Sequence, residues 1–180
     1  MVKQEIKLKR KKIKVGILGG SFDPAHKGHL AISKEAKKRF KLKKVVWAIT
    51  KKNPFKKESQ KSVPVRIKYC KKIIGTNSFI KVKFYENIIK SNKTINLINH
   101  LKKDKNIEIY FLMGADNLIH FHKWHKSELI SQKCNILVFD RHGYKKNSLK
   151  SKTFKQLSKT KLEFIEFNKV NISSSQLRKI

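Results

Sequence analysis

Short apolar runs alternate with longer amphipathic segments along most of this chain. Six runs have the length of strands and lie at 14–19, 45–49, 79–84, 107–113, 135–140 and 162–167. Helical spacing of apolar residues marks segments at 29–40, 63–74, 94–101 and 117–130, and a further helix is predicted to start at Ser173. Some strands are apolar at consecutive positions, as in strands buried on both faces. The pattern therefore predicts an α/β domain with a parallel sheet and crossover helices.

The chain's size and composition limit what it can be. Its 180 residues are 39% hydrophobic, enough for one packed domain. No apolar run is long enough for a membrane span, and the two cysteines are too few for a disulfide framework. We expect a basic, flexible arm at 1–12 and a single domain at 13–180, in a cytoplasmic protein with no membrane partner.

The charge of the chain is strongly positive, at +33. Only five of the 45 basic residues are Arg, and the lysines are spread along the whole sequence. Proteins that read nucleic acids commonly use the planar Arg fork, so we interpret the lysines as solvated surface that attracts small polyanions. A basic nucleic-acid-binding protein without enzymatic activity is the alternative from another class.

The first strand leads directly into the segment Gly19–His29, GGSFDPAHKGH. Two glycines would let the backbone turn sharply and approach a ligand. His26 and His29 are three positions apart at the opening of a helix, where amide N–H groups and imidazole donors suit an anion. The alternatives are two histidines that only cap or pack the helix, or a zinc site for which further ligands are missing.

This segment resembles the first signature of the adenylyltransferase superfamily with an HxGH motif, here His26–His29. The tail Ile172–Arg178, ISSSQLR, resembles the second signature of that superfamily, ISSxxxR. Further segments, at 53–56, 114–118, 121–125 and 141–144, are similar to bacterial nicotinate-nucleotide adenylyltransferases. The resemblance covers residues 13–180, and the family continues with a further helix beyond Arg178, so we expect the C-terminal helix to be truncated at Ile180.

The resemblance implies a Rossmann-like, doubly wound parallel sheet with helices on both faces. It implies transfer of AMP from ATP to nicotinate mononucleotide, giving nicotinate adenine dinucleotide and pyrophosphate in NAD biosynthesis. The substrate's own phosphate is the nucleophile, and Mg²⁺ accompanies ATP without a metal site built by the protein. Alternatives within the superfamily are adenylyltransferases for nicotinamide mononucleotide or phosphopantetheine. The oligomeric state stays open.

The resemblance also assigns residues to roles, and His26, His29 and Arg178 are the implied catalytic residues. The implied ATP site contains Gly19, Gly20, Ser21, Phe22, His26, His29, Gly114, Asp116, Arg141, Ser173, Ser174, Ser175 and Arg178. The implied contacts to the mononucleotide are Lys56, Thr94, Trp124 and His125.

Structural roles compete with several of these assignments. Asp116 could cap a helix, Trp124 could be a core residue, and Lys56 could lie on the solvated surface. The serines at 173–175 could form an ordinary helix cap, although their hydroxyls together with Arg178 also suit phosphate.

Overall fold

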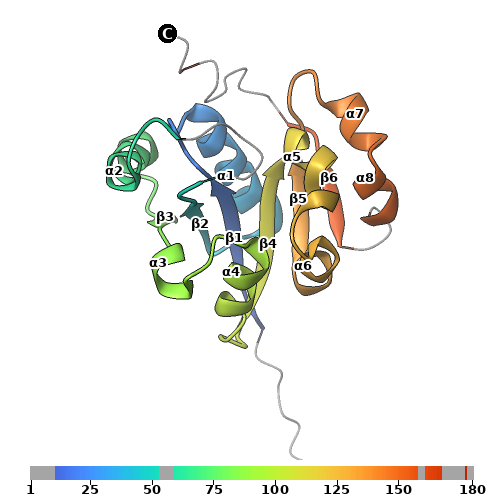
Figure 1. Cartoon of the computed structure of the whole chain (residues 1–180), viewed down its shortest axis with the longest axis horizontal. Coiled ribbons are helices and arrows are strands. Elements are labelled where there is room, and N and C mark those ends of the chain that lie inside the picture. The colour runs from blue at the N-terminus through green and yellow to red at the C-terminus, as the bar shows by residue number, and fades with distance from the viewer. Residues whose placement is uncertain (1–10, 53–58, 158–160, 168–176, 178–180) are drawn as a thin grey trace, which may run out of the picture.

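A single parallel sheet forms the centre of the molecule (Figure 1). The computed structural model describes residues 11–52, 59–157, 161–167 and 177. The strands within this part are β1 (Ile13–Gly20), β2 (Lys44–Ile49), β3 (Ile80–Lys83), β4 (Ile107–Gly114), β5 (Asn135–Phe139) and β6 (Leu162–Ile165). Their order is β3-β2-β1-β4-β5-β6, and all neighbours pair in parallel. The predicted doubly wound, Rossmann-like sheet is confirmed.

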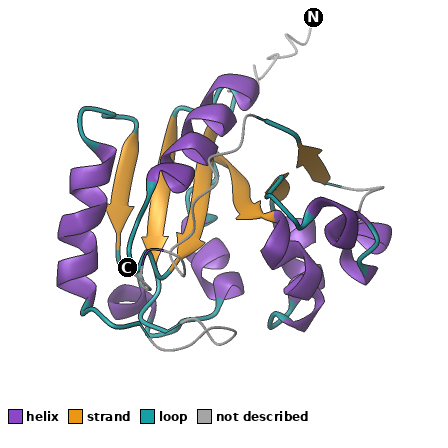
Figure 2. Cartoon of the chain, turned by 90° about the horizontal axis from the view of Figure 1, so that it is seen from above, coloured by secondary structure: helices purple, strands orange, loops and turns teal. Residues whose placement is uncertain are grey.

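Helices cover both faces of this sheet (Figure 2). They are α1 (Lys27–Phe40), α2 (Val63–Ile74), α3 (Glu86–Ile89), α4 (Thr94–Leu101), α5 (Ala115–His120), the 3₁₀ turn η1 (Phe121–Lys123), α6 (Ser127–Lys133), α7 (Lys145–Leu149) and α8 (Lys152–Leu157). Buried residues of α1 and α2 pack with one set of strand side chains, and those of α4, α5, η1 and α6 pack with the other.

Alternation along each strand creates these two cores. In β1, Val15 and Ile17 face the core under α4 and α5, whereas Leu18 faces the core under α1 and α2. In β2, Val46 and Trp47 divide in the same way. Because successive side chains of a strand point to opposite faces, strands buried on both faces must be apolar at consecutive positions. This is the pattern that predicted them.

The segment 117–130 is where the predicted elements differ most from the structure. It is not one helix, because α5 and η1 end before Trp124, which has extended backbone, and Lys126 adopts a left-handed φ of 55°. The break lets Trp124 pack against Phe121 and Phe111. Packing against the sheet thus outweighs the local helical spacing. The helix expected from Ser173 lies outside the described residues, apart from Leu177, which is helical.

The strand order also indicates where a ligand is expected to bind. β1 pairs with β2 on one side and with β4 on the other, so the winding of the sheet reverses at β1. In open parallel sheets ligands bind beyond the carboxyl ends of the strands at such a reversal. The segments that follow Gly20, Ile49 and Gly114 meet at this edge.

Candidate active site

The two histidines of the first motif form a reciprocal cap at the start of α1. His26 is the N-cap residue, and its Nδ1 accepts a hydrogen bond from the amide of Gly28 at 3.2 Å. The amide of His26 in turn donates to Nδ1 of His29 at 3.1 Å. The two ring centroids are 3.9 Å apart. The capping role that competed with the anion-binding role is therefore present in the structure.

This cap determines which imidazole nitrogen carries the proton. A neutral imidazole has one acceptor and one N–H donor, so accepting at Nδ1 places the proton on Nε2. Both rings thus carry an Nε2–H donor beside the N-terminus of a 14-residue helix. The first turn of α1 contains no acidic residue that would offset the positive end of the helix dipole. The arrangement is suited to a phosphate group.

The turn that carries the motif is made by Phe22 rather than by the glycines. Gly19 and Gly20 belong to β1, and neither has a positive φ, whereas Phe22 has a φ of 49°. A Cβ at Gly19 would meet only Phe111, at 3.6 Å, which is an ordinary contact. The expectation that the glycines allow the sharp turn is therefore wrong. What the missing side chain at the exposed Gly19 provides is an open backbone surface.

Buried aromatic side chains pack against the turn that carries the motif. The buried Phe22 stacks on Trp47 at 5.0 Å and lies 4.8 Å from the His29 ring. The indole N–H of Trp47 donates to Oγ of Ser33 at 2.8 Å, and that hydroxyl donates to the carbonyl of His29 at 2.8 Å. This chain of contacts connects the backbone of His29 to the buried Trp47 of β2.

Asp116 and Arg141 come together from the ends of β4 and β5. Nη1 of Arg141 lies 2.6 Å from Oδ2 of Asp116, and the Asp116 side chain is only 14% exposed. A Cβ on Gly114 would stand 2.5 Å from Asp116 Oδ1, so the glycine makes room for this carboxylate. The N-cap of α5 is Gly114, so the alternative in which Asp116 caps this helix is not what the structure shows. The pair joins two residues assigned to ATP, and neither strand alone could bring them together.

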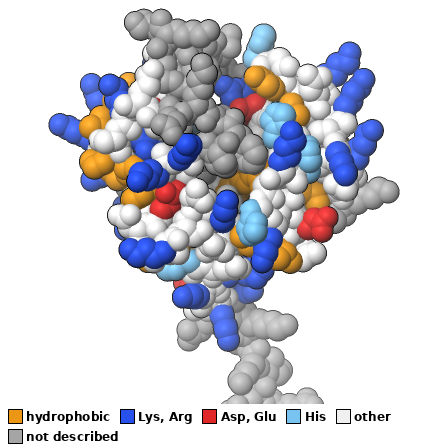
Figure 3. All heavy atoms as spheres, in the orientation of Figure 1, with side chains coloured by type: hydrophobic (Ala, Val, Ile, Leu, Met, Phe, Trp, Pro, Cys, Tyr) orange, Lys and Arg blue, Asp and Glu red, His pale blue; other side chains and the backbone are white. Residues whose placement is uncertain are grey.

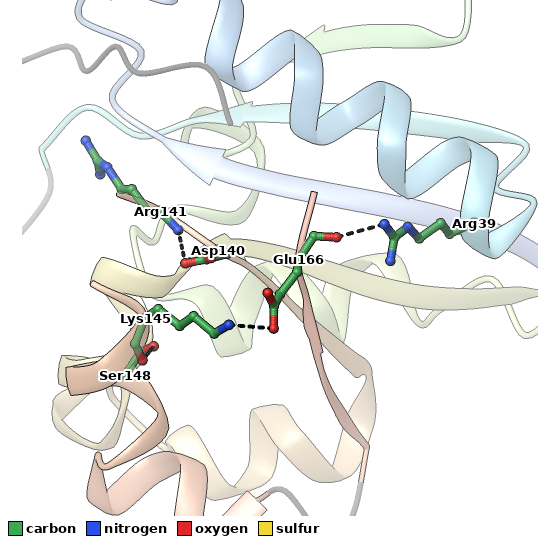
Figure 4. Close-up of polar contacts among 6 residues, drawn as sticks. All are labelled: Arg39, Asp140, Arg141, Lys145, Ser148 and Glu166. Carbon is green, nitrogen blue, oxygen red and sulfur yellow. Dashed lines mark hydrogen bonds and ion pairs between the residues drawn. The ribbon is translucent and has the colours of Figure 1, made fainter. Parts of the chain in front are cut away.

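The segment after β5 is tied to the end of β6 (Figure 4). The amide of Arg141 donates to Oδ1 of Asp140 at 2.6 Å. Lys145 forms an ion pair with Glu166 at 2.7 Å, which raises the pKa of the lysine, and Arg39 donates to the backbone carbonyl of Glu166 at 2.8 Å. The two contacts to Glu166 hold the chain where it leaves β6.

Two of the residues assigned to the mononucleotide, Thr94 and Trp124, lie on the face of the sheet that carries α4 and α6. Trp124 is half-buried, with its ring 5.9 Å from that of Phe111, so it belongs to the core and still presents surface. Thr94 is the first residue of α4 and is half-buried, and His125 is exposed. Lys56, the serines at 173–175 and Arg178 lie outside the described residues.

Arg66 is not among the predicted site residues, although it is a buried residue of α2 that contacts the same edge of the sheet. Its guanidinium donates to the backbone carbonyls of Ser21 and Thr50 at 2.6 and 2.8 Å. The spacing of Arg66, Cys70 and Ile74 places the arginine on the buried stripe of its helix, which was the available signal.

Two further properties concern metals and membranes. Within residues 11–52, 59–157 and 161–167, no three His, Cys, Asp or Glu side chains are grouped to hold a metal ion. In the same part of the chain, no helix has both the length and the apolar character to cross a bilayer.

Comparisons with known proteins agree on one family. The cytidylyltransferase-like family model matches residues 17–180. A probable nicotinate-nucleotide adenylyltransferase of Pelagibacter ubique is 66% identical over 180 residues, which is 100% of both chains. Another, from Nitratiruptor sp., is 38% identical over 74% of this chain and 76% of its own length.

A solved structure shares the fold. It is a Plasmodium falciparum nicotinic acid mononucleotide adenylyltransferase complexed with NaAD, with a TM-score of 0.74 and 23% identity. The match covers 93% of this chain and 83% of that one. At this level of identity, the match supports the architecture of the sheet and its helices.

Proposed function

The chain belongs to the nicotinate-nucleotide adenylyltransferase family, and on this basis we propose that it transfers AMP from ATP to nicotinate mononucleotide. The products are nicotinate adenine dinucleotide and pyrophosphate. The observation that carries this proposal is the reciprocal cap of His26 and His29, which presents two imidazole N–H donors at the N-terminus of α1. The reaction needs such a site because it brings two polyanions together.

In the proposed reaction, a phosphate oxygen of the mononucleotide attacks the α-phosphorus of ATP. A new P–O bond forms there as the bond to the departing pyrophosphate breaks, so no nucleophile from the protein is required. We assign the Nε2–H groups of His26 and His29 to the ATP phosphates, where they would stabilise the charge that develops on oxygen. Arg178 and the serines at 173–175 would contact the same phosphates.

Three other residues would orient the two nucleotides. Asp116 would accept hydrogen bonds from ribose hydroxyls, and Arg141, its ion-pair partner, would contact ATP. Trp124 would stack on the pyridine ring, which its half-buried position allows. Gly19, Gly20, Ser21, Phe22 and Gly114 would line the ATP site, and Lys56, Thr94 and His125 would contact the mononucleotide.

Mg²⁺ is proposed to enter as part of the ATP complex. It is a hard cation that keeps several waters and is commonly held by substrate phosphates, so it needs few or no protein ligands.

We further place the reaction in the cytoplasm. Two free cysteines, both buried, suit a reducing compartment.

Nucleic acid is not expected to be a partner despite the charge. On the face drawn in Figure 3, Lys and Arg side chains are scattered from one side to the other instead of forming one stripe. A distribution of this kind supports the interpretation as solvated surface.

One reaction panel tests the proposal. Purified protein with Mg²⁺ and ATP is given nicotinate mononucleotide, nicotinamide mononucleotide or phosphopantetheine, and dinucleotide and pyrophosphate are measured by chromatography. We expect the nicotinate nucleotide to react well above the other two. Preference for another acceptor would reassign the substrate. No turnover, together with tight and steeply salt-dependent binding to DNA or RNA, would favour the nucleic-acid-binding alternative.

A further inference from the structure

Arg66 is a buried charge whose side chain donates hydrogen bonds to the main chain. Only 2% of the residue is exposed. Burial is the largest influence on its pKa, which is lowered, while the nearby Asp23 acts in the opposite direction. The guanidinium donates to four backbone carbonyls, those of Ser21 at 2.6 Å, Thr50 at 2.8 Å, Lys51 at 3.3 Å and Lys61 at 3.0 Å.

These four carbonyls belong to segments that are far apart in the sequence. Ser21 follows β1, Thr50 and Lys51 follow β2, and Lys61 precedes α2. Five N–H donors in one rigid plane allow a guanidinium to hold several acceptors at fixed angles, which the point charge of a lysine cannot reproduce. A buried charge is tolerated only while its hydrogen bonds are made, so Arg66 favours one relative position of these segments.

The carbonyl of Ser21 belongs to the turn that carries the histidine pair. Phe22 and Asp23 follow directly, and His26 then caps α1. The same turn is held a second time, because the amide of Gln60 donates to Oδ2 of Asp23 at 2.6 Å. The segment before α2 therefore holds the turn at Asp23, and α2 itself holds it at Ser21.

We propose that Arg66 is a positioning residue for AMP transfer, because its guanidinium fixes the turn that carries His26 and His29 to the end of β2. The inference rests on the proposed function. The Arg66 guanidinium bonds carbonyls in the loops at the carboxyl edge of the sheet, and none of these carbonyls belongs to a residue within a strand. Losing it should therefore displace the imidazole donors from the reacting phosphates while the sheet persists.

A second residue, Glu86, also holds the loop that follows β2, and it allows a separate test of the same arrangement. Glu86, at the start of α3, accepts hydrogen bonds from the hydroxyl of Thr50 and, at 3.2 Å, from the amide of Lys51. Arg66 thus holds the carbonyls of Thr50 and Lys51, and Glu86 holds the hydroxyl of Thr50 and the amide of Lys51. Releasing Glu86 should disturb the same turn indirectly, because Arg66 bonds the carbonyl of Thr50 and the carbonyl of Ser21 at once.

The test compares Arg66→Lys with Lys68→Arg. Both keep the charge and both lie on α2, but Lys68 is exposed and serves as the matched control. With nicotinate mononucleotide and ATP, at a temperature well below each variant's Tm, we expect Arg66→Lys to lower kcat about a hundredfold, the scale of an ångström-sized misplacement. The Kd of ATP should change only a few-fold, and Lys68→Arg should behave like the wild type.

A purely structural role would give a different result. Arg66→Lys would then have a lower Tm but a normal kcat per folded molecule, and this outcome would overturn the proposal. If Arg66→Lys does not fold, Glu86→Ala decides: a several-fold fall in kcat supports the tethered turn, and an unchanged kcat refutes it. An inactive wild type removes the proposed function itself, whereas an active wild type with an active Arg66→Lys removes only the role of Arg66.

Discussion

Replacing His29 should separate its role in the reaction from its role in the helix cap. His29→Ala removes both the Nδ1 acceptor for the amide of His26 and the Nε2–H donor. His29→Asn removes only the latter, because the amide oxygen of Asn can occupy about the position of Nδ1. The two variants should therefore share a loss of activity and differ in stability.

The expected magnitudes follow from the contacts. Losing the cap costs His29→Ala about 1 kcal/mol of unfolding free energy. Losing the ring that lies 4.8 Å from Phe22 adds about 0.5–1.5 kcal/mol. For a chain of this length, each 1 kcal/mol lowers Tm by about 2–4 °C. The ring contact is lost in both variants, so His29→Asn should unfold above His29→Ala by the contribution of the cap.

Activity should fall by the same factor in both variants. Loss of one preorganised donor to developing charge lowers kcat by about 100- to 1000-fold. The assay is steady-state formation of nicotinate adenine dinucleotide at saturating Mg²⁺ and ATP, with thermal unfolding followed on the same preparations. A His29→Asn protein with near-normal kcat would refute the role of the Nε2–H donor, and a normal His29→Ala protein would remove His29 from the site altogether.

Three further predictions concern the core, the thiols and the acceptor site. Ser33→Ala should lower the unfolding free energy by about 1–3 kcal/mol in urea, because the buried indole N–H of Trp47 loses its acceptor; additive effects of Ser33→Ala and Trp47→Phe would contradict this coupling. Burial raises the pKa of Cys70 and of Cys134 to about 12. A thiol reagent at pH 8 should therefore label both cysteines only in denaturant, and because unfolded thiols ionise at lower pH, stability should fall as pH rises past about 9; rapid labelling of the native protein would disprove the burial. Trp124→Ala should raise KM for nicotinate mononucleotide about tenfold and leave KM for ATP unchanged, with Trp124→Phe intermediate; equal effects on both substrates would argue against stacking.

Much of the fold could be predicted from local patterns. Each of the six predicted strands is present. The four central strands are buried on both faces and are therefore apolar at consecutive positions, a signal contained within a few residues of sequence. The cap formed by His26 and His29 is likewise a local feature, because residues three apart at a helix start can cap each other without contacts from distant segments. The same locality explains the error at 117–130, where helical spacing continued but Trp124 turned to pack on Phe111.

The sequence by itself determined the strands, most of the helices, the capped histidine pair and the family resemblance. The tertiary structure alone decided that Asp116 meets Arg141 and that Arg66 holds the carbonyls of Ser21 and Thr50. The physical reason is the range of the forces that set each feature. Periodicity and capping act over one or two turns, whereas the meeting of strand ends depends on the strand order, which is fixed when the whole sheet packs between its helices.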